Sequence, residues 1–247
     1  MAQRSFLELV SSKNLIIVPI FNEAWNLPLL FERLGALKKS WDVLYINDGS
    51  SDSSKELLEA QGSNFIDLAY NIGIGGCVQT GLKYAFEHEY DYAVQLDGDG
   101  QHPIEALSEL LEEVNSNECD IAIGSRFKRD KKHPVGRTRR LGIRILSSTI
   151  KVLTGQTILD PTSGYRLFNR KSISLLSENY PQDYPEPESV VFLLKNGLRI
   201  CEVPVRMNSR EGGISSIHRD GIFYMAKVML SMIMVVLRPK ESSHGSR

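Results

Sequence analysis

Two aspartates separated by one glycine, Asp97 and Asp99, carry the strongest chemical signal in the sequence. They follow the apolar run of residues 92–96, which predicts that they stand on a tight turn at the end of a buried strand. Two carboxylates at positions i and i+2 can present oxygens to one hard divalent cation, the kind of ligand that Mg²⁺ and Mn²⁺ prefer. Gln101 could add a ligand or hold a metal-bound water. Such a turn is common by itself, so the prediction of a Mg²⁺ or Mn²⁺ site rests also on what surrounds it.

A basic stretch over residues 126–144 is the second chemical signal. It holds nine Lys and Arg residues and a single acid, Asp130: Arg126, Lys128, Arg129, Lys131, Lys132, Arg137, Arg139, Arg140 and Arg144. Guanidinium forks bind phosphate, and an anionic bilayer attracts lysines. We therefore expect Arg126, with Arg139 or Arg140, to bind the phosphate of an acceptor, and the lysines to serve a membrane surface. The alternative is an ordinary solvated charged loop.

The elements that must position these residues follow from the alternation of apolar and amphipathic segments. We predict strands at residues 14–20, 43–47, 65–69, 92–96 and 120–123, and helices at residues 26–39, 51–61, 75–89 and 103–115. Continuous apolar strands between helices are typical of a mostly parallel α/β sheet with helices on both faces, of the doubly wound, Rossmann-like kind. Ligands bind such sheets beyond the carboxyl ends of the strands. All five predicted strands end in polar residues, so we expect a ligand site at that edge.

The second half of the chain is less regular. It predicts a helix that ends near residues 154–155, short strands at 163–168 and 199–203, and a turn and helix at 183–195. We expect one domain over residues 1–220, an apolar helix over residues 221–238 and a disordered tail over residues 239–247.

Several motifs along the chain together resemble those of a known family. They are Val18-Pro19-Ile20-Phe21-Asn22-Glu23, Ile46-Asn47-Asp48-Gly49-Ser50-Ser51-Asp52, Asn71-x-Gly73, Leu96-Asp97-Gly98-Asp99-Gly100-Gln101-His102-Pro103, Gly124-Ser125-Arg126, Asp160-Pro-Thr-Ser-Gly-Tyr-Arg166, Glu202-Val-Pro-Val205 and Arg210-x-Gly-Gly-x-Ser215. In this order and spacing the sequence resembles the family 2 glycosyltransferases with the GT-A fold. The later motifs resemble the dolichyl-phosphate mannose synthase and polyprenyl-phosphate glycosyltransferase branch.

The resemblance implies roles at the matching positions. Four residues should line the pocket for the nucleotide base and ribose: Pro19, Asn22, Glu23 and Asp48. Asp97 and Asp99, with Gln101, should hold the metal on the diphosphate of a sugar nucleotide. Asp48 could instead cap a helix or stabilise a turn. We assign no catalytic role to His102, His133 or His218.

Two further sites depart from the family pattern. The glycine-rich loop at residues 210–215 suits closure over a diphosphate, but Ser216 stands where the family often has lysine, so the phosphate contact would rest on Arg210. Glu186 and Glu188 replace part of a glycine-tyrosine-acid-phenylalanine pattern. They could accept hydrogen bonds from the sugar, or they could be acids in the first turn of a helix.

Composition and charge bound the function further. Lys and Arg total 29 and Asp and Glu 30, so a net charge of −1 argues against nucleic acid as a partner. Three widely spaced cysteines predict neither a disulfide nor a zinc site and favour a reducing cytosol. The start of the chain lacks a signal-peptide pattern, and no segment reaches the roughly 20 apolar residues of a transmembrane helix.

The apolar segment at residues 222–237 is too short to span a bilayer, since 16 residues of helix extend only about 24 Å against a hydrocarbon core of ~30 Å. It is either a core helix or, as we slightly favour, an in-plane membrane helix or a docking surface for a small membrane protein.

These observations predict a metal-dependent, inverting glycosyltransferase. The resemblance implies that it would move a sugar from a nucleoside diphosphate, which the family leads us to expect is UDP, to polyprenyl phosphate for cell-surface glycan assembly. We expect a peripheral protein at the cytoplasmic face of the membrane. A first alternative is a family 2 enzyme that glycosylates a sugar hydroxyl, with Asp183, Glu186 or Glu188 as the base. A second is a sugar-nucleotide-binding subunit without catalysis.

Overall fold

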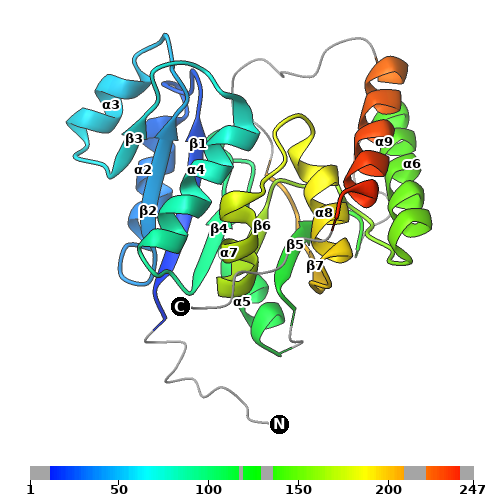
Figure 1. Cartoon of the computed structure of the whole chain (residues 1–247). Helices are drawn as coiled ribbons and strands as arrows, with labels where there is room; N and C mark the ends of the chain where they lie inside the picture. The colour runs from blue at the N-terminus through cyan, green and yellow to red at the C-terminus, as the bar shows by residue number, and fades with distance from the viewer. Residues whose placement is uncertain (1–11, 117–118, 129–135, 209–220, 240–247) are drawn as a thin grey trace.

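A seven-stranded sheet in the order β3-β2-β1-β4-β6-β5-β7 forms the centre of the molecule (Figure 1). The computed structural model describes residues 12–116, 119–128, 136–208 and 221–239. Its strands are β1 (Asn14–Ile20), β2 (Asp42–Asn47), β3 (Phe65–Asp67), β4 (Tyr92–Gln95), β5 (Ile121–Ser125), β6 (Arg166–Asn169) and β7 (Ile200–Pro204). β6 runs antiparallel to both of its neighbours, and the other pairs are parallel. The predicted α/β class with a mostly parallel sheet is therefore confirmed.

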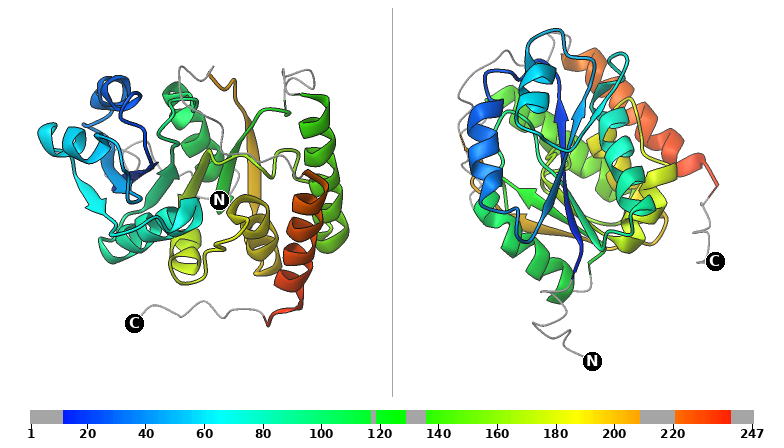
Figure 2. Two further views of the ribbon diagram at one scale, coloured as in Figure 1. Left: turned by 90° about the horizontal axis from the view of Figure 1, so that it is seen from above. Right: turned by 90° about the vertical axis from the view of Figure 1, so that its left-hand side faces the viewer.

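Helices cover both faces of this sheet (Figure 2). They are α2 (Leu27–Gly35), α3 (Ser54–Ala60), α4 (Gly73–Glu87), the short 3₁₀ helix η1 (Ile104–Ala106), α5 (Leu107–Ser116), α6 (Arg137–Thr154), α7 (Arg170–Glu178), α8 (Pro185–Lys195) and α9 (Gly221–Leu237). One core cluster lies between the sheet and helices α4, α7 and α8, and the other lies between the sheet and helices α2 and α5. Within β1, Leu15 and Ile17 enter the first cluster and Ile16 and Val18 enter the second. From Leu15 to Ile20 the strand is apolar because both of its faces are buried.

Helix α7 was not predicted from the sequence. Its first turn is stabilised by Asn169, whose side chain accepts a hydrogen bond from the backbone N–H of Ser172. Asn is a favoured helix N-cap, and this residue was the available signal. The helix predicted to begin at residue 51 begins at Ser54, because Asp52 Oδ1 accepts the N–H of that residue and holds the preceding turn.

The expectation that the cysteines form no disulfide is wrong in this structure. Cys119 is bonded to Cys201, with 6.0 Å between their Cα atoms, and the buried Cys77 is free. The pairing of Ile121 with Ile200 in adjacent parallel strands brings the two cysteines together. The two cysteines are 82 residues apart along the chain, so their spacing gave no sign that they are close in space.

Candidate active site at the carboxyl ends of the strands

The site lies where β1 and β4 separate. Their pairing ends at Ile17 and Gln95, and the strand order reverses there: β2 and β3 lie on one side of β1, and β6, β5 and β7 lie beyond β4. The carbonyl of Ile17 accepts the N–H of Leu96, which follows β4, and the carbonyl of Ile20 accepts the N–H of Asp48, which follows β2. Backbone polar groups point alternately to the two sides of a strand, so the backbone N of Pro19 points to the β4 side. The pairing with β4 has ended there, so the missing N–H of Pro19 costs no hydrogen bond. Such a reversal point is where open α/β sheets bind ligands.

Of the expected nucleotide-binding residues, Pro19 lies near the end of β1, and Asn22, Glu23 and Asp48 lie on the loops after β1 and β2. Asn22 has φ +56°, and its Oδ1 accepts the backbone N–H groups of Ser51 at 2.8 Å and Asp52 at 3.3 Å. The N–H of Glu23 donates to Ser54 Oγ at 3.0 Å. The first loop is therefore tied to the second by hydrogen bonds that involve the backbone.

Asp48 holds the start of α4. Its two carboxylate oxygens accept the backbone N–H groups of Ile72 at 2.7 Å and Gly73 at 3.0 Å. The side chain is buried, with 3% of the residue exposed. This is the helix-capping arrangement that the sequence left open, since backbone N–H groups at a helix start need acceptors.

Asp97 keeps its carboxylate partly open at the end of β4, with 39% of the side chain exposed. Its backbone N–H donates to His102 Nδ1 at 3.0 Å, and His102 Nε2 lies 3.4 Å from Asp97 Oδ2. Because Nδ1 accepts this N–H, the proton of a neutral imidazole resides on Nε2. The ring is buried and stacks on Tyr165 at 4.8 Å between centroids. His102 thus supports the turn, a role that the sequence analysis missed.

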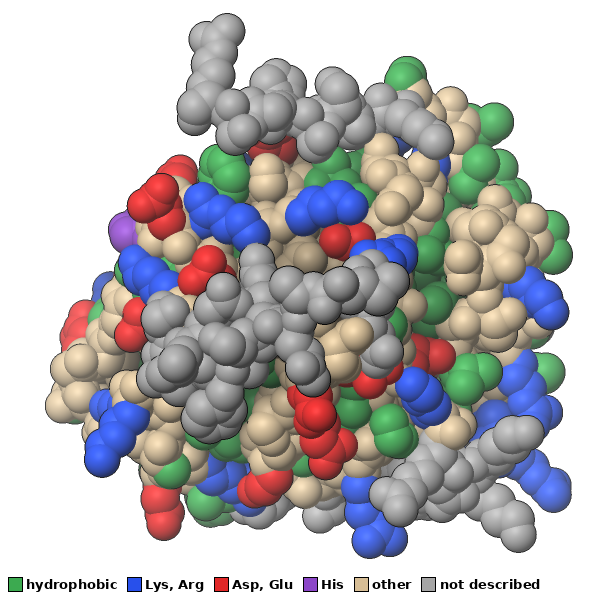
Figure 3. All heavy atoms as spheres, turned by 90° about the horizontal axis from the view of Figure 1, so that it is seen from below, with side chains coloured by type: hydrophobic (Ala, Val, Ile, Leu, Met, Phe, Trp, Pro, Cys, Tyr) green, Lys and Arg blue, Asp and Glu red, His purple; other side chains and the backbone are tan. Residues whose placement is uncertain are grey.

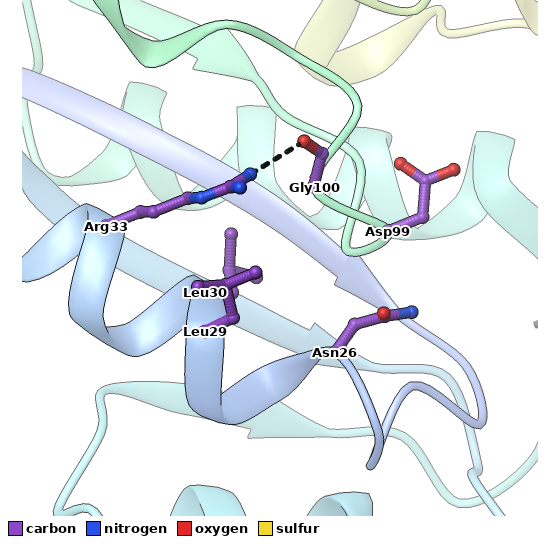
Figure 4. Close-up of a pocket in the computed structure, with 6 residues that line it drawn as sticks. All are labelled: Asn26, Leu29, Leu30, Arg33, Asp99 and Gly100. Atoms are coloured by element: carbon purple, nitrogen blue, oxygen red, sulfur yellow. Dashed lines mark hydrogen bonds between the residues drawn. The ribbon is translucent and has the colours of Figure 1, made fainter. Parts of the chain in front are cut away.

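Asp99 lies on the same turn beside a small pocket at the start of α2 (Figure 4). Asp99 Oδ1 accepts the N–H of Gln101 at 3.0 Å, and the Gly100 carbonyl accepts from Arg33 Nη1 at 3.1 Å. The turn passes close over β1, because a Cβ on Gly98 would lie 3.0 Å from the Pro19 carbonyl oxygen. Only a residue without a side chain allows this approach.

The donor set of this turn fits a divalent cation that is shared with a substrate. In the described part of the chain, no group of three or more His, Cys, Asp and Glu side chains could hold a metal ion. Mg²⁺ is usually held by one or two carboxylates together with substrate phosphates and water. Asp97 and Asp99 provide two carboxylates at the edge where such sheets bind ligands.

Arg126, after β5, is held by the buried Asp160. Its Nε and Nη2 donate to the two carboxylate oxygens at 2.7 Å each, and Nη2 also donates to Thr162 Oγ1 at 2.9 Å. Asp160 is fully buried, and Glu202 accepts its backbone N–H at 2.9 Å. Desolvation, followed by the charge of Arg126, lowers the pKa of Arg139, although much of the Arg139 surface is exposed. These two guanidinium groups therefore share one region, with Arg140 next to them on α6.

One loop joins the acidic turn to Arg126. In the segment from Asp160 to Arg166, a Cβ on Gly164 would lie 3.0 Å from Gln95 Nε2 and 3.3 Å from Asp97 Oδ1. The same segment provides the carboxylate that binds Arg126. The glycine lets the loop pass against Asp97, so the acidic and basic parts of the site are neighbours.

Arg166 is fully buried and holds the far side of this loop. Its guanidinium donates to the carbonyls of Ser163, Pro161 and Glu186 and to Ser189 Oγ, at 2.6 to 3.0 Å. These bonds connect the loop to the start of α8. The sequence analysis gave Arg166 no role, since a buried arginine cannot be told from an exposed one by its type.

The structure separates the two acids expected in a sugar pocket. Burial raises the pKa of Glu186, and the nearby Asp97 raises it further while Arg166 lowers it. Glu188 instead accepts a hydrogen bond from Ser231 Oγ of α9 at 2.7 Å, and burial raises its pKa. Two residues along a helix lie about 200° apart around its axis, so the pair cannot face one pocket. The assignment of Glu188 is corrected to the α8–α9 contact.

Arg210, residues 129–135 of the basic stretch and residues 240–247 of the expected tail lie outside the described residues. Asn208, the last described residue before Arg210, donates its N–H to the Gln101 carbonyl at 2.8 Å. Among the described residues no helix is long and apolar enough to cross a membrane.

Comparison with known proteins gives consistent matches. The model of glycosyl transferase family 2 matches residues 15–176. The polyprenol monophosphomannose synthase of Mycolicibacterium smegmatis is 29% identical over 236 residues, which cover 88% of this chain and 87% of that protein. The undecaprenyl-phosphate mannosyltransferase of Micrococcus luteus is 30% identical over 210 residues, covering 81% and 86%. The UDP-N-acetylglucosamine–dolichyl-phosphate N-acetylglucosaminyltransferase of Methanococcus voltae is 29% identical over 212 residues, covering 77% and 84%.

The fold also matches a solved structure. Glucosyl-3-phosphoglycerate synthase of Mycobacterium tuberculosis, in complex with Mn²⁺, UDP and glucosyl-3-phosphoglycerate, superposes with a TM-score of 0.71 at 16% identity, covering 97% of this chain and 86% of that one. The match confirms the expected GT-A fold.

Proposed function

Because this chain belongs to glycosyl transferase family 2 and is therefore a glycosyltransferase, we propose that it transfers a sugar from a nucleoside diphosphate to polyprenyl phosphate. The observation that carries the proposal is the loop from Asp160 to Arg166, which packs Gly164 against Asp97 and binds Arg126 through Asp160. A carboxylate turn suited to a donor diphosphate thus lies beside arginines suited to an anionic acceptor. The names of three relatives support this acceptor class.

On the donor side, Pro19, Asn22 and Glu23 border the nucleotide, and Asp48 acts by holding the start of α4 beside it. Asp97 and Asp99, with Gln101, would hold Mg²⁺ or Mn²⁺. When bound, the cation supplies charge neutralisation on the departing diphosphate. His102 holds the backbone of Asp97 in position, and Arg210 would contribute a further positive charge to the diphosphate. The name of the Methanococcus voltae relative supports a UDP-sugar donor.

On the acceptor side, Arg126, Arg139 and Arg140 bring a phosphate to the sugar against charge repulsion from the diphosphate. Such an acceptor is already anionic near neutral pH, so the reaction needs no general base. A direct attack on the anomeric carbon, opposite the leaving diphosphate, inverts its configuration. Glu186 borders the sugar near Asp97 and can accept its hydroxyl hydrogen bonds. The acceptor lipid would bring this protein to the cytoplasmic face of a membrane as a peripheral enzyme for cell-surface glycan assembly.

One observation favours a second candidate, transfer to a sugar hydroxyl. That reaction needs a base, and burial raises the pKa of Glu186, which makes this carboxylate a stronger base than an exposed one. Since the chain is a glycosyltransferase, a non-catalytic binding subunit is not retained.

Cell-free turnover tests the proposal. The purified protein is incubated with UDP-glucose, UDP-N-acetylglucosamine or GDP-mannose, with Mn²⁺, and with either undecaprenyl phosphate or an oligosaccharide acceptor. We expect a lipid-linked product from a UDP-sugar and no product on the oligosaccharide. Product on the oligosaccharide alone would support the second candidate, and the single-turnover rate of Glu186→Gln separates the two. This rate should change little for a phosphate acceptor and collapse if Glu186 is the base.

A further inference from the structure

Helix α9 carries apolar residues on two faces, and only one of them is packed. Val228, Met232 and Val235 are buried against the core. A second row at i, i+3, i+4 and i+7 is exposed: Leu230 at 59%, Ile233 at 42%, Met234 at 53% and Leu237 at 79%. A helix that packs only on a core shows polar residues on its outer face. The two readings of this segment from the sequence, core helix and surface helix, therefore each describe one face.

Helix α6 carries a matching row. Leu141, Ile145 and Val152 are 59%, 39% and 85% exposed, and they lie on the face opposite the buried side of the helix. Arg144 and Lys151, which are exposed and seven residues apart, border this row. Their spacing places them on one side of the apolar row.

The two exposed rows form one surface. α6 and α9 lie side by side (Figures 1 and 2), and a Cβ on Gly142 would lie 3.6 Å from Met225 Sδ. This contact joins the early turns of both helices. Since the buried rows of both helices face the interior, the exposed rows face outward together. Seen from below, hydrophobic and basic side chains lie next to one another along this edge (Figure 3).

The charge of the surface is of one sign. The sequences of α6 and α9 contain no Asp or Glu. α9 contains one basic residue, Lys227, and α6 contains five: Arg137, Arg139, Arg140, Arg144 and Lys151. Exposed apolar residues on two helices whose own charged residues are all cations match an anionic lipid surface, where the apolar side chains enter the acyl boundary and the cations meet the headgroups.

The position of the surface also fits. Arg139 and Arg140, proposed for the acceptor phosphate, lie at the start of the helix whose next turns carry Leu141 and Ile145. The phosphate of a polyprenyl lipid lies at the headgroup level with its chain in the hydrocarbon. One helix would thus meet both levels of the bilayer.

We propose that the outward face of α6 and α9, made of Leu141, Ile145, Val152, Leu230, Ile233, Met234 and Leu237, is a docking surface for an anionic phospholipid bilayer. The inference deepens the proposed function and rests on it for the position of the acceptor phosphate. The apolar rows supply insertion and the basic residues supply electrostatic attraction, and stable attachment takes two such signals.

Vesicle sedimentation of the full chain tests the proposal. We expect the parent to bind vesicles of phosphatidylglycerol and phosphatidylcholine, and to bind pure phosphatidylcholine at least about tenfold more weakly. Leu230→Ser with Leu237→Ser should lower the partition coefficient at least about tenfold, because both side chains leave the apolar contact. Arg144→Gln with Lys151→Gln should remove most of the preference for anionic vesicles. High salt should weaken binding by the parent more than by this charge variant.

The matched control is Ile74→Ser with Phe86→Ser, which removes exposed apolar surface from α4 instead. It should bind vesicles like the parent. Val152→Ser changes a side chain that is 85% exposed, so it tests the surface without a risk of unfolding. It should lower vesicle binding several-fold with unchanged circular dichroism. Equal binding by the parent, Val152→Ser and the α9 variant would overturn the proposal.

A short-chain, water-soluble polyprenyl phosphate separates this proposal from the proposed function. The surface variants should transfer sugar to it at the parent rate. A parent that transfers sugar to it but does not bind anionic vesicles would refute the docking surface alone. A parent that binds vesicles through this face but transfers no sugar would refute the acceptor alone. If the α9 variant dissolves a dimer and leaves vesicle binding unchanged, the face is an interface between two copies, and the bilayer proposal is wrong.

Discussion

Both oxygens of Asp48 accept backbone N–H groups, whereas Asp97 keeps 39% of its side chain exposed. Asp48 follows β2 and Asp97 follows β4, at the same edge of the sheet, yet their different hydrogen bonds suit them to different roles. A carboxylate with satisfied oxygens holds a backbone turn, and one left open at a ligand-binding edge can bind a cation. Two acids of α8 differ in a similar way, since Glu188 accepts from Ser231 whereas Glu186 lies near Asp97.

At the residue scale, Asp99→Asn should lower metal-dependent transfer at least about 100-fold, because a charged ligand to the cation is lost. The melting temperature should stay near that of the parent, since the side-chain oxygen of Asn can still accept the N–H of Gln101 as Asp99 Oδ1 does. Asp91→Asn is the matched control, as Asp91 accepts from Lys13 at the opposite ends of the strands. Full activity of Asp99→Asn, or of the parent in excess chelator, would contradict the metal assignment.

Arg126 and Arg139 should respond differently to removal. Arg126→Ala leaves the fully buried Asp160 without its partner, and we expect it to destabilise the fold by about 3–5 kcal/mol. Arg139→Ala removes an exposed side chain and should change stability by less than about 0.5 kcal/mol while raising the acceptor KM. Urea unfolding and initial rates measure the two effects. A stable Arg126→Ala protein would show that the pair with Asp160 is not structural.

At the element scale, the contact between α8 and α9 contains a buried acid, Glu188, whose pKa is raised by burial. The folded protein therefore binds this proton more tightly than the unfolded chain does. As the pH rises from the ordinary glutamate range through the raised pKa, the parent loses stability relative to Glu188→Gln. We expect the difference in free energy of unfolding to shift steadily in favour of the variant and then level off. A difference independent of pH between 4 and 8 would contradict the burial of this charge.

The junction of β5 and β7 predicts the number of free thiols. With Cys119 bonded to Cys201, the denatured and unreduced chain should show one reactive thiol, that of Cys77, and three after reduction. In the chain-entropy picture, the bond across 82 residues stabilises the fold by about 4 kcal/mol, so Cys201→Ser should lower the urea midpoint. Three thiols before reduction would restore the expectation drawn from the sequence.

At the scale of the whole molecule, the antiparallel strand β6 joins the two halves of the site. It pairs with β4, which leads to the acidic turn, and with β5, which leads to Arg126. The two parts are therefore fixed on one sheet, and no domain closure is needed to bring them together.

Ligand binding should stabilise this sheet as a unit. We expect UDP with Mn²⁺, at about 100 times the dissociation constant, to stabilise the fold by about 2.7 kcal/mol, or about 5–10 °C in melting temperature. UDP alone or Mn²⁺ alone should have a much smaller effect, because each provides part of the other's binding site. Thermal scans with UDP and GDP in parallel measure this. Equal stabilisation by both nucleotides would contradict the preference for UDP.

The sequence by itself determined the class of fold and the positions of the first five strands along the chain, and it predicted the polar edge at which the family motifs gather. These features depend on local patterns: apolar strands such as residues 14–20 are buried on both faces, and the Asp97-to-Asp99 turn must follow β4. Only the tertiary structure decided which polar groups meet. The pairing of Arg126 with Asp160, of Glu188 with Ser231 and of Cys119 with Cys201 joins residues 34, 43 and 82 positions apart. Residue type and spacing do not encode such contacts, because they depend on strand order and on which face of a helix is covered.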